Sequence, residues 1–243
     1  MKARQLAVIV LGSLALGACS SLNPFSSSES KITPLKPLSN PLKTTEVWRS
    51  RVGDAGVFVF QPAPSGDAVF AAGRDGTVQR LEVGCTVSKT SVDSTLSGGV
   101  GTNGKLVLVG SPKGEVIALD AVSGQIKWRA RVNAEILAAP AVSDNIVVVR
   151  SADSRLFGLD PADGKQRWVY QRVTPSLSLR NAAGVFLDDK AILAGFPGGK
   201  LTAINPLNGS LMWEGTVAVP RGSTELERVA DITSLPAMGA RAT

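Results

Sequence analysis

Apolar and polar positions follow one short pattern three times along this chain. The copies begin at Gly114, Ser154 and Gly199. Each copy opens with a short apolar run, has Asp or Asn six positions after its start and Gly ten positions after, and ends at Trp fourteen positions after. The tryptophans are spaced by 40 and then 45 residues, at Trp128, Trp168 and Trp213. A fourth one, Trp48, lies 80 residues before Trp128, which is two periods of the repeat.

Each copy is predicted to be a hairpin, because Asp or Asn followed by Gly suits a tight turn between two apolar strands. Two more candidate strands precede the later hairpins, 138–143 with 146–150, and 184–187 with 191–195. Four short strands in a period near 40 residues are typical of a β-propeller blade, so the chain is predicted to be all-β. A tryptophan at a fixed register is interpreted as a wedge between neighbouring blades; the alternative is a ligand site.

A less regular copy fills the missing period. The segment 76–82 aligns with the other starts, Thr90 stands at the Trp position, and the turn glycine moves to Gly84. Candidate strands 57–61 and 68–73 precede it. The pattern predicts PQQ-like four-stranded blades at about 56–92, 98–132, 137–172 and 182–218, with the start of a fifth blade at 219–243.

The N-terminus carries a targeting pattern. Lys2 and Arg4 precede an apolar run, 6–16, that is too short to span a bilayer, and the run ends in Leu-Gly-Ala-Cys19. This end resembles a bacterial lipobox, which implies lipid attachment at Cys19. Residues 1–18 are thus predicted to be a signal peptide, 19–44 a lipidated, Ser- and Pro-rich flexible tether, and 45–243 a partial β-propeller. Ser20, where an aspartate favours inner-membrane retention, points to the outer membrane.

Composition removes several classes of function. The chain has no histidine, which excludes histidine-dependent triads and histidine metal sites, and its net charge of +6 is not gathered into a basic run. The glycine-rich segments 98–101 and 195–199 lack the Lys of a phosphate loop. Asp153, Asp160 and Asp163 could suggest a calcium loop, but their positions recur as turn residues in the other copies of the repeat. Cys85, which has no partner for an internal disulfide, is predicted to be a small buried strand residue. We expect no enzyme, catalytic residue, metal, cofactor or nucleic-acid partner.

Two further segments carry a family resemblance. Pro175-Ser-Leu-Ser-Leu-Arg180 lies between two blades, and Gly222-Ser-Thr-Glu-Leu-Glu-Arg-Val-Ala-Asp231 follows the last one. Together with the lipobox, the tether and the Trp hairpins, they resemble the BamB family of lipoproteins of the outer-membrane β-barrel assembly machinery, over residues 1 to about 235. The resemblance implies an eight-bladed, non-enzymatic scaffold that is anchored by lipid on the periplasmic face of the outer membrane. It also implies binding to BamA POTRA domains within the Bam complex, and a role in assembling and inserting outer-membrane protein clients.

In this family the Leu-x-Leu-Arg loop and the nearby acidic stretch make the BamA contact. Carried over, the contact residues are Leu177, Leu179, Arg180 and Asp231, while Thr233 stands where many members have a second acidic residue. The spacing of the repeat adds support, because four extra residues fall between Trp168 and Asp188, and insertions in repeat proteins map to loops. In an extended segment both leucines point the same way. The alternative is that they face the core.

The chain departs from the family in length. About four and a half blades are predicted where the family closes eight, so we expect a fragment or a frameshifted end, with an open arc that folds poorly or aggregates alone. Residues 46–52 resemble the last strand of a blade. Two rival functions stay open, a fragment of a PQQ-dependent quinoprotein dehydrogenase and a lipoprotein propeller that binds another envelope partner.

Overall fold

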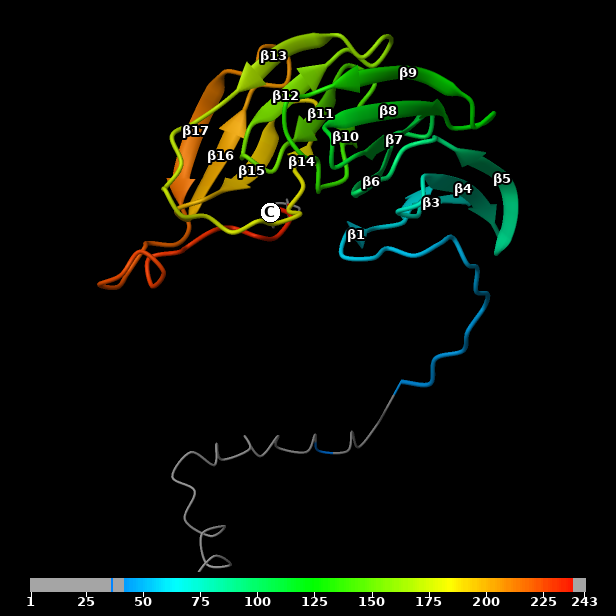
Figure 1. Cartoon of the computed structure of the whole chain (residues 1–243), viewed down its shortest axis with the longest axis horizontal. Helices are drawn as coiled ribbons and strands as arrows, with labels where there is room; N and C mark the ends of the chain where they lie inside the picture. Colours follow the sequence, from blue (N-terminus) through cyan, green and yellow to red (C-terminus); the bar gives the residue numbers. More distant parts are fainter. Residues whose placement is uncertain (1–35, 37–41, 238–243) are drawn as a thin grey trace, which may run out of the picture. The chain divides into compact units, whose positions relative to one another are not determined.

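A computed structural model describes residue 36 and residues 42–237. The chain divides into two compact units, residues 1–45 and 46–243. The described residues of the first unit, 36 and 42–45, form no helix or strand. The second unit contains 17 strands, β1–β17, and its described part contains no helix, which confirms the all-β class (Figure 1). Accordingly, this part of the chain holds no helix long and apolar enough to cross a membrane.

The strands form four sheets, and in each sheet four successive strands pair antiparallel in sequence order; the second sheet carries β1 as an additional, parallel edge strand. The first sheet contains β2 (Ala63–Ser65), β3 (Ala68–Ala72), β4 (Thr77–Glu82) and β5 (Cys85–Ser91). The second contains β6 (Gly98–Thr102), β7 (Leu106–Gly110), β8 (Glu115–Asp120) and β9 (Ile126–Arg131). The third contains β10 (Ala141–Val142), β11 (Val147–Arg150), β12 (Leu156–Leu159) and β13 (Gln166–Tyr170). The fourth contains β14 (Phe186–Leu187), β15 (Ile192–Phe196), β16 (Lys200–Ile204) and β17 (Leu211–Thr216).

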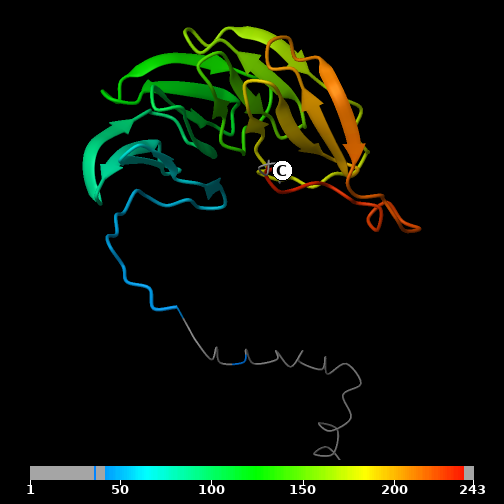
Figure 2. The same ribbon diagram turned by 180° about the vertical axis from the view of Figure 1, so that it is seen from behind.

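Within the second unit the sheets follow one another along an arc. Their first strands lie on its inner side and their last strands on its outer side (Figures 1 and 2). This arrangement confirms the four-stranded propeller blades predicted from the repeat. The first strand of the third and fourth blades is shorter than predicted, with only two residues in β10 and two in β14.

One predicted strand belongs to a different sheet. The segment 57–61 was expected to open the first blade, but its strand β1 (Val59–Phe60) pairs parallel with β6 at the inner edge of the second sheet. The strand β2 takes the first position of the first sheet instead. Pro62 explains the difference, because proline has no N–H for a ladder hydrogen bond, and the chain changes sheets at this residue, between β1 and β2.

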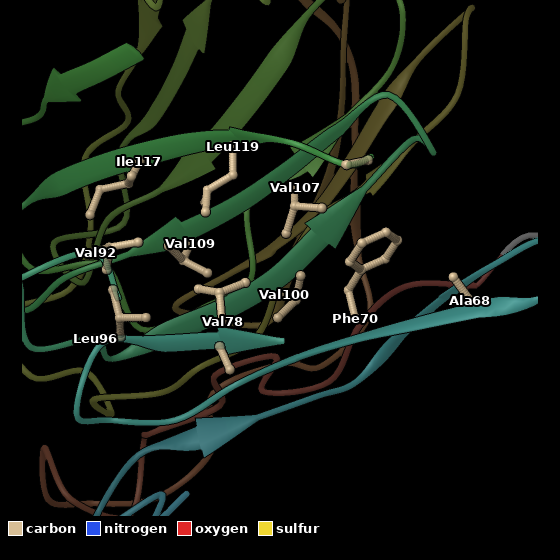
Figure 3. Packing of buried hydrophobic residues seen from close by; sticks show 12 residues of the cluster. Ala68, Phe70, Val78, Val92, Leu96, Val100, Val107, Val109, Ile117 and Leu119 are labelled. Carbon is tan, nitrogen blue, oxygen red and sulfur yellow. The ribbon is translucent and has the colours of Figure 1, made fainter. Parts of the chain in front are cut away.

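The core lies between neighbouring blades. The middle strands are apolar on both faces, since each sheet is covered on two sides; every residue of β7, β11 and β12 is buried. The outer strands β9 and β13 are mostly exposed and bury their tryptophan. Three buried clusters result, one between each neighbouring pair of sheets. Figure 3 shows the first, in which Phe70 and Val78 of one sheet face Val107 and Val109 of the next.

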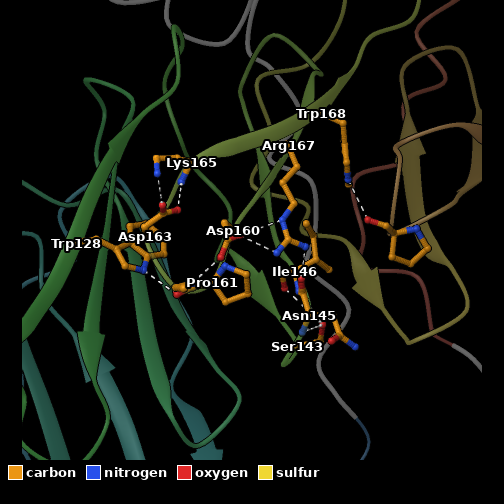
Figure 4. A network of polar contacts seen from close by, with 12 residues as sticks. Trp128, Ser143, Asn145, Ile146, Asp160, Pro161, Asp163, Lys165, Arg167 and Trp168 are labelled. Carbon is orange, nitrogen blue, oxygen red and sulfur yellow. Dashed lines mark hydrogen bonds and ion pairs between the residues drawn. The ribbon is translucent and has the colours of Figure 1, made fainter.

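The predicted tryptophan wedge is confirmed at two junctions. The Trp128 indole Nε1–H donates to the carbonyl of Pro161 in the next blade at 2.8 Å, and Trp168 does the same to Pro206 at 2.9 Å (Figure 4). A Cβ on Gly209, in the turn that follows Pro206, would lie 2.7 Å from the Trp168 ring. This glycine is therefore needed both for its φ of +70° and for the room that it leaves to the indole.

The first blade, whose repeat is less regular, makes the same contact with the next blade through a smaller side chain. Thr90, at the Trp position, donates its hydroxyl to the carbonyl of Gly124 at 2.8 Å. Trp48 lies over Gly84 in the first blade, whereas Trp213 of the last strand is 48% exposed. The wedge is thus a repeated contact from one blade to the turn of the following blade.

Three further expectations are wrong. Residues 46–52 form no strand, because no described segment pairs with them, and a strand needs a hydrogen-bonded neighbour. The predicted fifth blade, 219–243, has no strand over its described residues 219–237. Cys85 is exposed, since it begins β5, the outermost strand of its sheet. The signal peptide 1–18, Cys19 and most of the tether lie outside the described residues.

Candidate functional site

The long connection between β13 and β14 carries the Leu-x-Leu-Arg segment. Residues 171–185 form no strand, and residues 177–180, which we call the contact loop, are exposed throughout. The side chains of Leu177 and Leu179 are 41% and 51% exposed. The alternative that both leucines face the core is therefore wrong, and their predicted exposure is confirmed.

Arg180 is held by a carboxylate that sequence analysis did not identify. Its Nε and Nη2 donate to the two carboxylate oxygens of Glu135, at 3.1 and 2.7 Å. Glu135 lies in the connection between β9 and β10, one blade earlier in the chain. The pKa of Arg180 is raised, first because Glu135 accepts this hydrogen bond. The Arg180 side chain is still 57% exposed, so this cation lies at the surface in a fixed orientation.

Asp231 lies against the same loop, although it is 52 residues away from Leu179 in the chain. Its Oδ2 accepts a hydrogen bond from the Leu179 amide at 2.6 Å, and its Oδ1 accepts one from the Gly198 amide at 3.2 Å. The segment that follows β17 therefore returns beside the β13–β14 connection, as both views show (Figures 1 and 2). The structure thus brings all four predicted site residues, Leu177, Leu179, Arg180 and Asp231, into one region.

A buried cation lies below this region. Arg150, at the end of β11, is only 6% exposed; it donates to the carbonyl of Ala183 at 3.2 Å and lies 5.4 Å from the Phe196 ring centroid. Burial lowers the pKa of Arg150 to about 10, while the nearby negative charge of Asp231 opposes this change. Arg150 was not among the predicted site residues, although a single charged residue at the end of an apolar strand could have indicated it.

A weakly polar cavity lies close to this region. The cavity, of about 430 Å³, lies among β1, β6, β10, residues 182–185 and residues 233–235, and its polar side chains come from Gln61, Thr233 and Ser234. Over residue 36 and residues 42–237, no group of three Cys, Asp or Glu side chains is placed to hold a metal ion. What the loop region offers is two exposed apolar side chains beside a fixed guanidinium, which is an arrangement suited to a protein contact.

A family model described as "Outer membrane protein assembly factor BamB" matches residues 40–242. Among curated relatives, the outer membrane protein assembly factor BamB of Bordetella pertussis is 39% identical over 239 residues, which is 97% of this chain and 61% of the relative. The one from Nitrosomonas eutropha is 43% identical over 212 residues, which is 86% of this chain and 50% of the relative. The chain thus spans only about half to three fifths of the length of these relatives.

Solved structures agree with the fold. The crystal structure of BamB from Moraxella catarrhalis has a TM-score of 0.70 and 30% identity, over 74% of this chain and 55% of that one. A quinohemoprotein alcohol dehydrogenase from Pseudomonas putida has a TM-score of 0.57 at 16% identity, over 70% of this chain and 35% of that one. At that low identity, the second likeness shows a common propeller fold and nothing about chemistry.

Proposed function

We propose that this chain, which belongs to the family of the outer membrane protein assembly factor BamB, is a non-enzymatic scaffold of the outer-membrane β-barrel assembly machinery. Its partner is the POTRA region of BamA, and its role is to aid the assembly and insertion of outer-membrane proteins. The residues that make up the BamA-binding site are Leu177, Leu179, Arg180 and Asp231. One observation carries the proposal: the two leucines are exposed beside an ion-paired arginine on a loop that Asp231 holds.

The two leucines are expected to make a measurable contribution to the affinity of such a contact. Each leucine has about half of its side chain exposed, and burying that half is worth roughly 1 kcal/mol. Two leucines together therefore change the affinity by roughly 30-fold, before Arg180 contributes.

A matched pair of variants tests the proposal. The double substitution Leu177→Ser and Leu179→Ser should weaken binding to the purified periplasmic domains of BamA by at least about tenfold. The control is Leu207→Ser, because Leu207 is 73% exposed and lies in the turn after Ile204, at the end of β16 opposite to Gly198. Equal loss of affinity in both variants, or no loss in the loop variant, would contradict the proposed contact.

The lipid anchor and the location are part of the same proposal. Residues 1–18 act as the signal peptide, Cys19 carries the lipid, 19–44 form the tether, and the propeller faces the periplasm from the outer membrane. Multiple acyl chains give stable membrane attachment, since each buried CH₂ contributes about 0.8 kcal/mol. The substitution Cys19→Ser should abolish labelling by radioactive palmitate and release the protein from outer-membrane fractions. Palmitate labelling that survives this substitution would rule out Cys19 as the anchor.

A further inference from the structure

We infer that Glu135 and Asp231 form a two-carboxylate clamp that positions the contact loop, and that Asp231 acts on the loop backbone rather than on the partner. This inference rests on the proposed function for its purpose. Its geometry, however, can be measured without any partner. Glu135 is a site residue that neither the family motif nor the repeat pattern indicates.

The first observation behind the clamp is the pair of hydrogen bonds that Asp231 accepts. Both of its carboxylate oxygens accept backbone N–H groups, from Leu179 at 2.6 Å and from Gly198 at 3.2 Å. A carboxylate used in this way draws the loop down onto the β15–β16 turn of the fourth blade. It is poorly placed to pair with a cation on a partner, because both of its oxygens already accept backbone hydrogen bonds.

The neighbour of Asp231 in the chain keeps the carboxylate in place. The Ile232 side chain lies against Gly195 of β15, where an added Cβ would collide with it. Because isoleucine is β-branched and has few side-chain conformations, this packing restricts residue 232 and, through it, Asp231. Pro175, earlier in the same connection, packs over Gly198 from the other side.

Glu135 is the second carboxylate of the clamp, and it lies in the connection between β9 and β10. Its own carbonyl accepts the Ala152 amide at 2.7 Å, and the next residue, Ile136, is fully buried and donates its amide to Ser111 at 3.2 Å. The carboxylate that meets Arg180 therefore stands on a fixed backbone. The bidentate pair uses Nε and Nη2 of Arg180, which leaves Nη1 directed away from Glu135.

The clamp explains how an irregular connection can present a defined surface. Two carboxylates, one from the β9–β10 connection and one from the segment after β17, fix Leu179 by its backbone and Arg180 by its side chain. Between them, the leucine side chains and Nη1 of Arg180 remain for a partner, whose complementary surface would offer an apolar pocket beside a carboxylate or carbonyl oxygen. A loop ordered before binding loses less conformational entropy when the partner arrives, so the affinity is higher.

Amide hydrogen exchange at Leu179 tests the clamp directly. Asp231→Ala should accelerate exchange of the Leu179 amide at least tenfold and weaken BamA binding at least tenfold. Asp231→Asn, which keeps an acceptor oxygen, should give smaller changes of both. Glu135→Gln should weaken binding about threefold to tenfold. The control is Glu115→Gln, because Glu115 pairs with Arg129 at 2.7 Å on the second sheet at similar exposure, and it should change neither measurement.

The outcomes separate this inference from the proposed function. If Asp231→Ala weakens binding while Leu179 exchange stays as in the unmodified chain, Asp231 contacts the partner directly and the clamp is overturned. If Glu135→Gln binds as well as Glu115→Gln, Glu135 has no positioning role. If the unmodified chain does not bind BamA at all, the proposed function fails. The exchange measurement then still tests the clamp: accelerated exchange of the Leu179 amide in Asp231→Ala supports it, and unchanged exchange overturns it.

Discussion

Truncating one tryptophan wedge should destabilise the fold far more than truncating its solvent-facing counterpart. Trp168 is 7% exposed, packs over the Gly209 turn of the fourth blade and donates to Pro206 at 2.9 Å. Trp213 occupies the same register in the last strand but is 48% exposed. The comparison between Trp168→Ala and Trp213→Ala therefore isolates the contact between blades from the residue type.

The structure sets the size of the effect. Removing a buried tryptophan costs about 3–5 kcal/mol, and the loss of its hydrogen bond to Pro206 belongs to that figure. Trp168→Phe keeps most of the apolar burial but loses the N–H donor, so about 1–2 kcal/mol is expected. Trp213→Ala should cost about 2 kcal/mol, because only about half of its surface is removed from water. Against a total stability of about 5–15 kcal/mol, the first loss is severe.

Urea unfolding followed by far-ultraviolet circular dichroism measures these differences without relying on tryptophan emission. The free energies are comparable where the variants share one dependence on urea concentration. Trp168→Ala is expected to destabilise the fold more than either Trp168→Phe or Trp213→Ala. A Trp168→Ala variant that unfolds within about 1 kcal/mol of Trp213→Ala would refute the wedge as the main contact between these blades.

Two other predictions follow from single side chains. Hydrogen bonds from the Ser123 amide and hydroxyl lower the pKa of Asp120, so its contribution to stability is complete above about pH 4 and is lost as the pH falls through the lower folded-state pKa. Asp120→Asn should thus reduce the loss of stability as the pH falls below about 4 in urea titrations, and an unchanged acid profile would contradict this. Cys85 is exposed, so in a Cys19→Ser chain a maleimide should label it under native conditions; labelling that needs urea would show that it is buried.

Local features were predictable because they depend on neighbours in the sequence. The turn positions of Asp120 and Gly124, for example, follow from residue types at fixed spacing, and the same spacing places Trp128 against the next blade. The extra residues in their connection indicated a loop, whereas the exposure of Leu177 and Leu179 within it was favoured by the family resemblance. The turn and wedge predictions needed only the period of the repeat and the chemistry of turns.

Contacts between distant segments were not predictable in the same way. Glu135 and Arg180 are 45 residues apart and lie in connections without a repeated pattern, so nothing local marks them as a pair. The resemblance indicated Asp231 but not that its carboxylate meets backbone amides. For β1, Pro62 was a usable signal that the chain leaves one sheet for another. Cys85 was misplaced because an outermost strand has no neighbour to cover it.

The most direct test of the central claim is site-specific photo-crosslinking in living cells, with a photoreactive residue at position 179 and, separately, at position 207. Leu179 lies on the contact loop, whereas Leu207 is an exposed leucine in a turn at the opposite end of β16. The account predicts a crosslink to BamA from position 179 and none from position 207. A BamA crosslink from position 207 alone, or none from either position while the protein is present in the outer membrane, would contradict it.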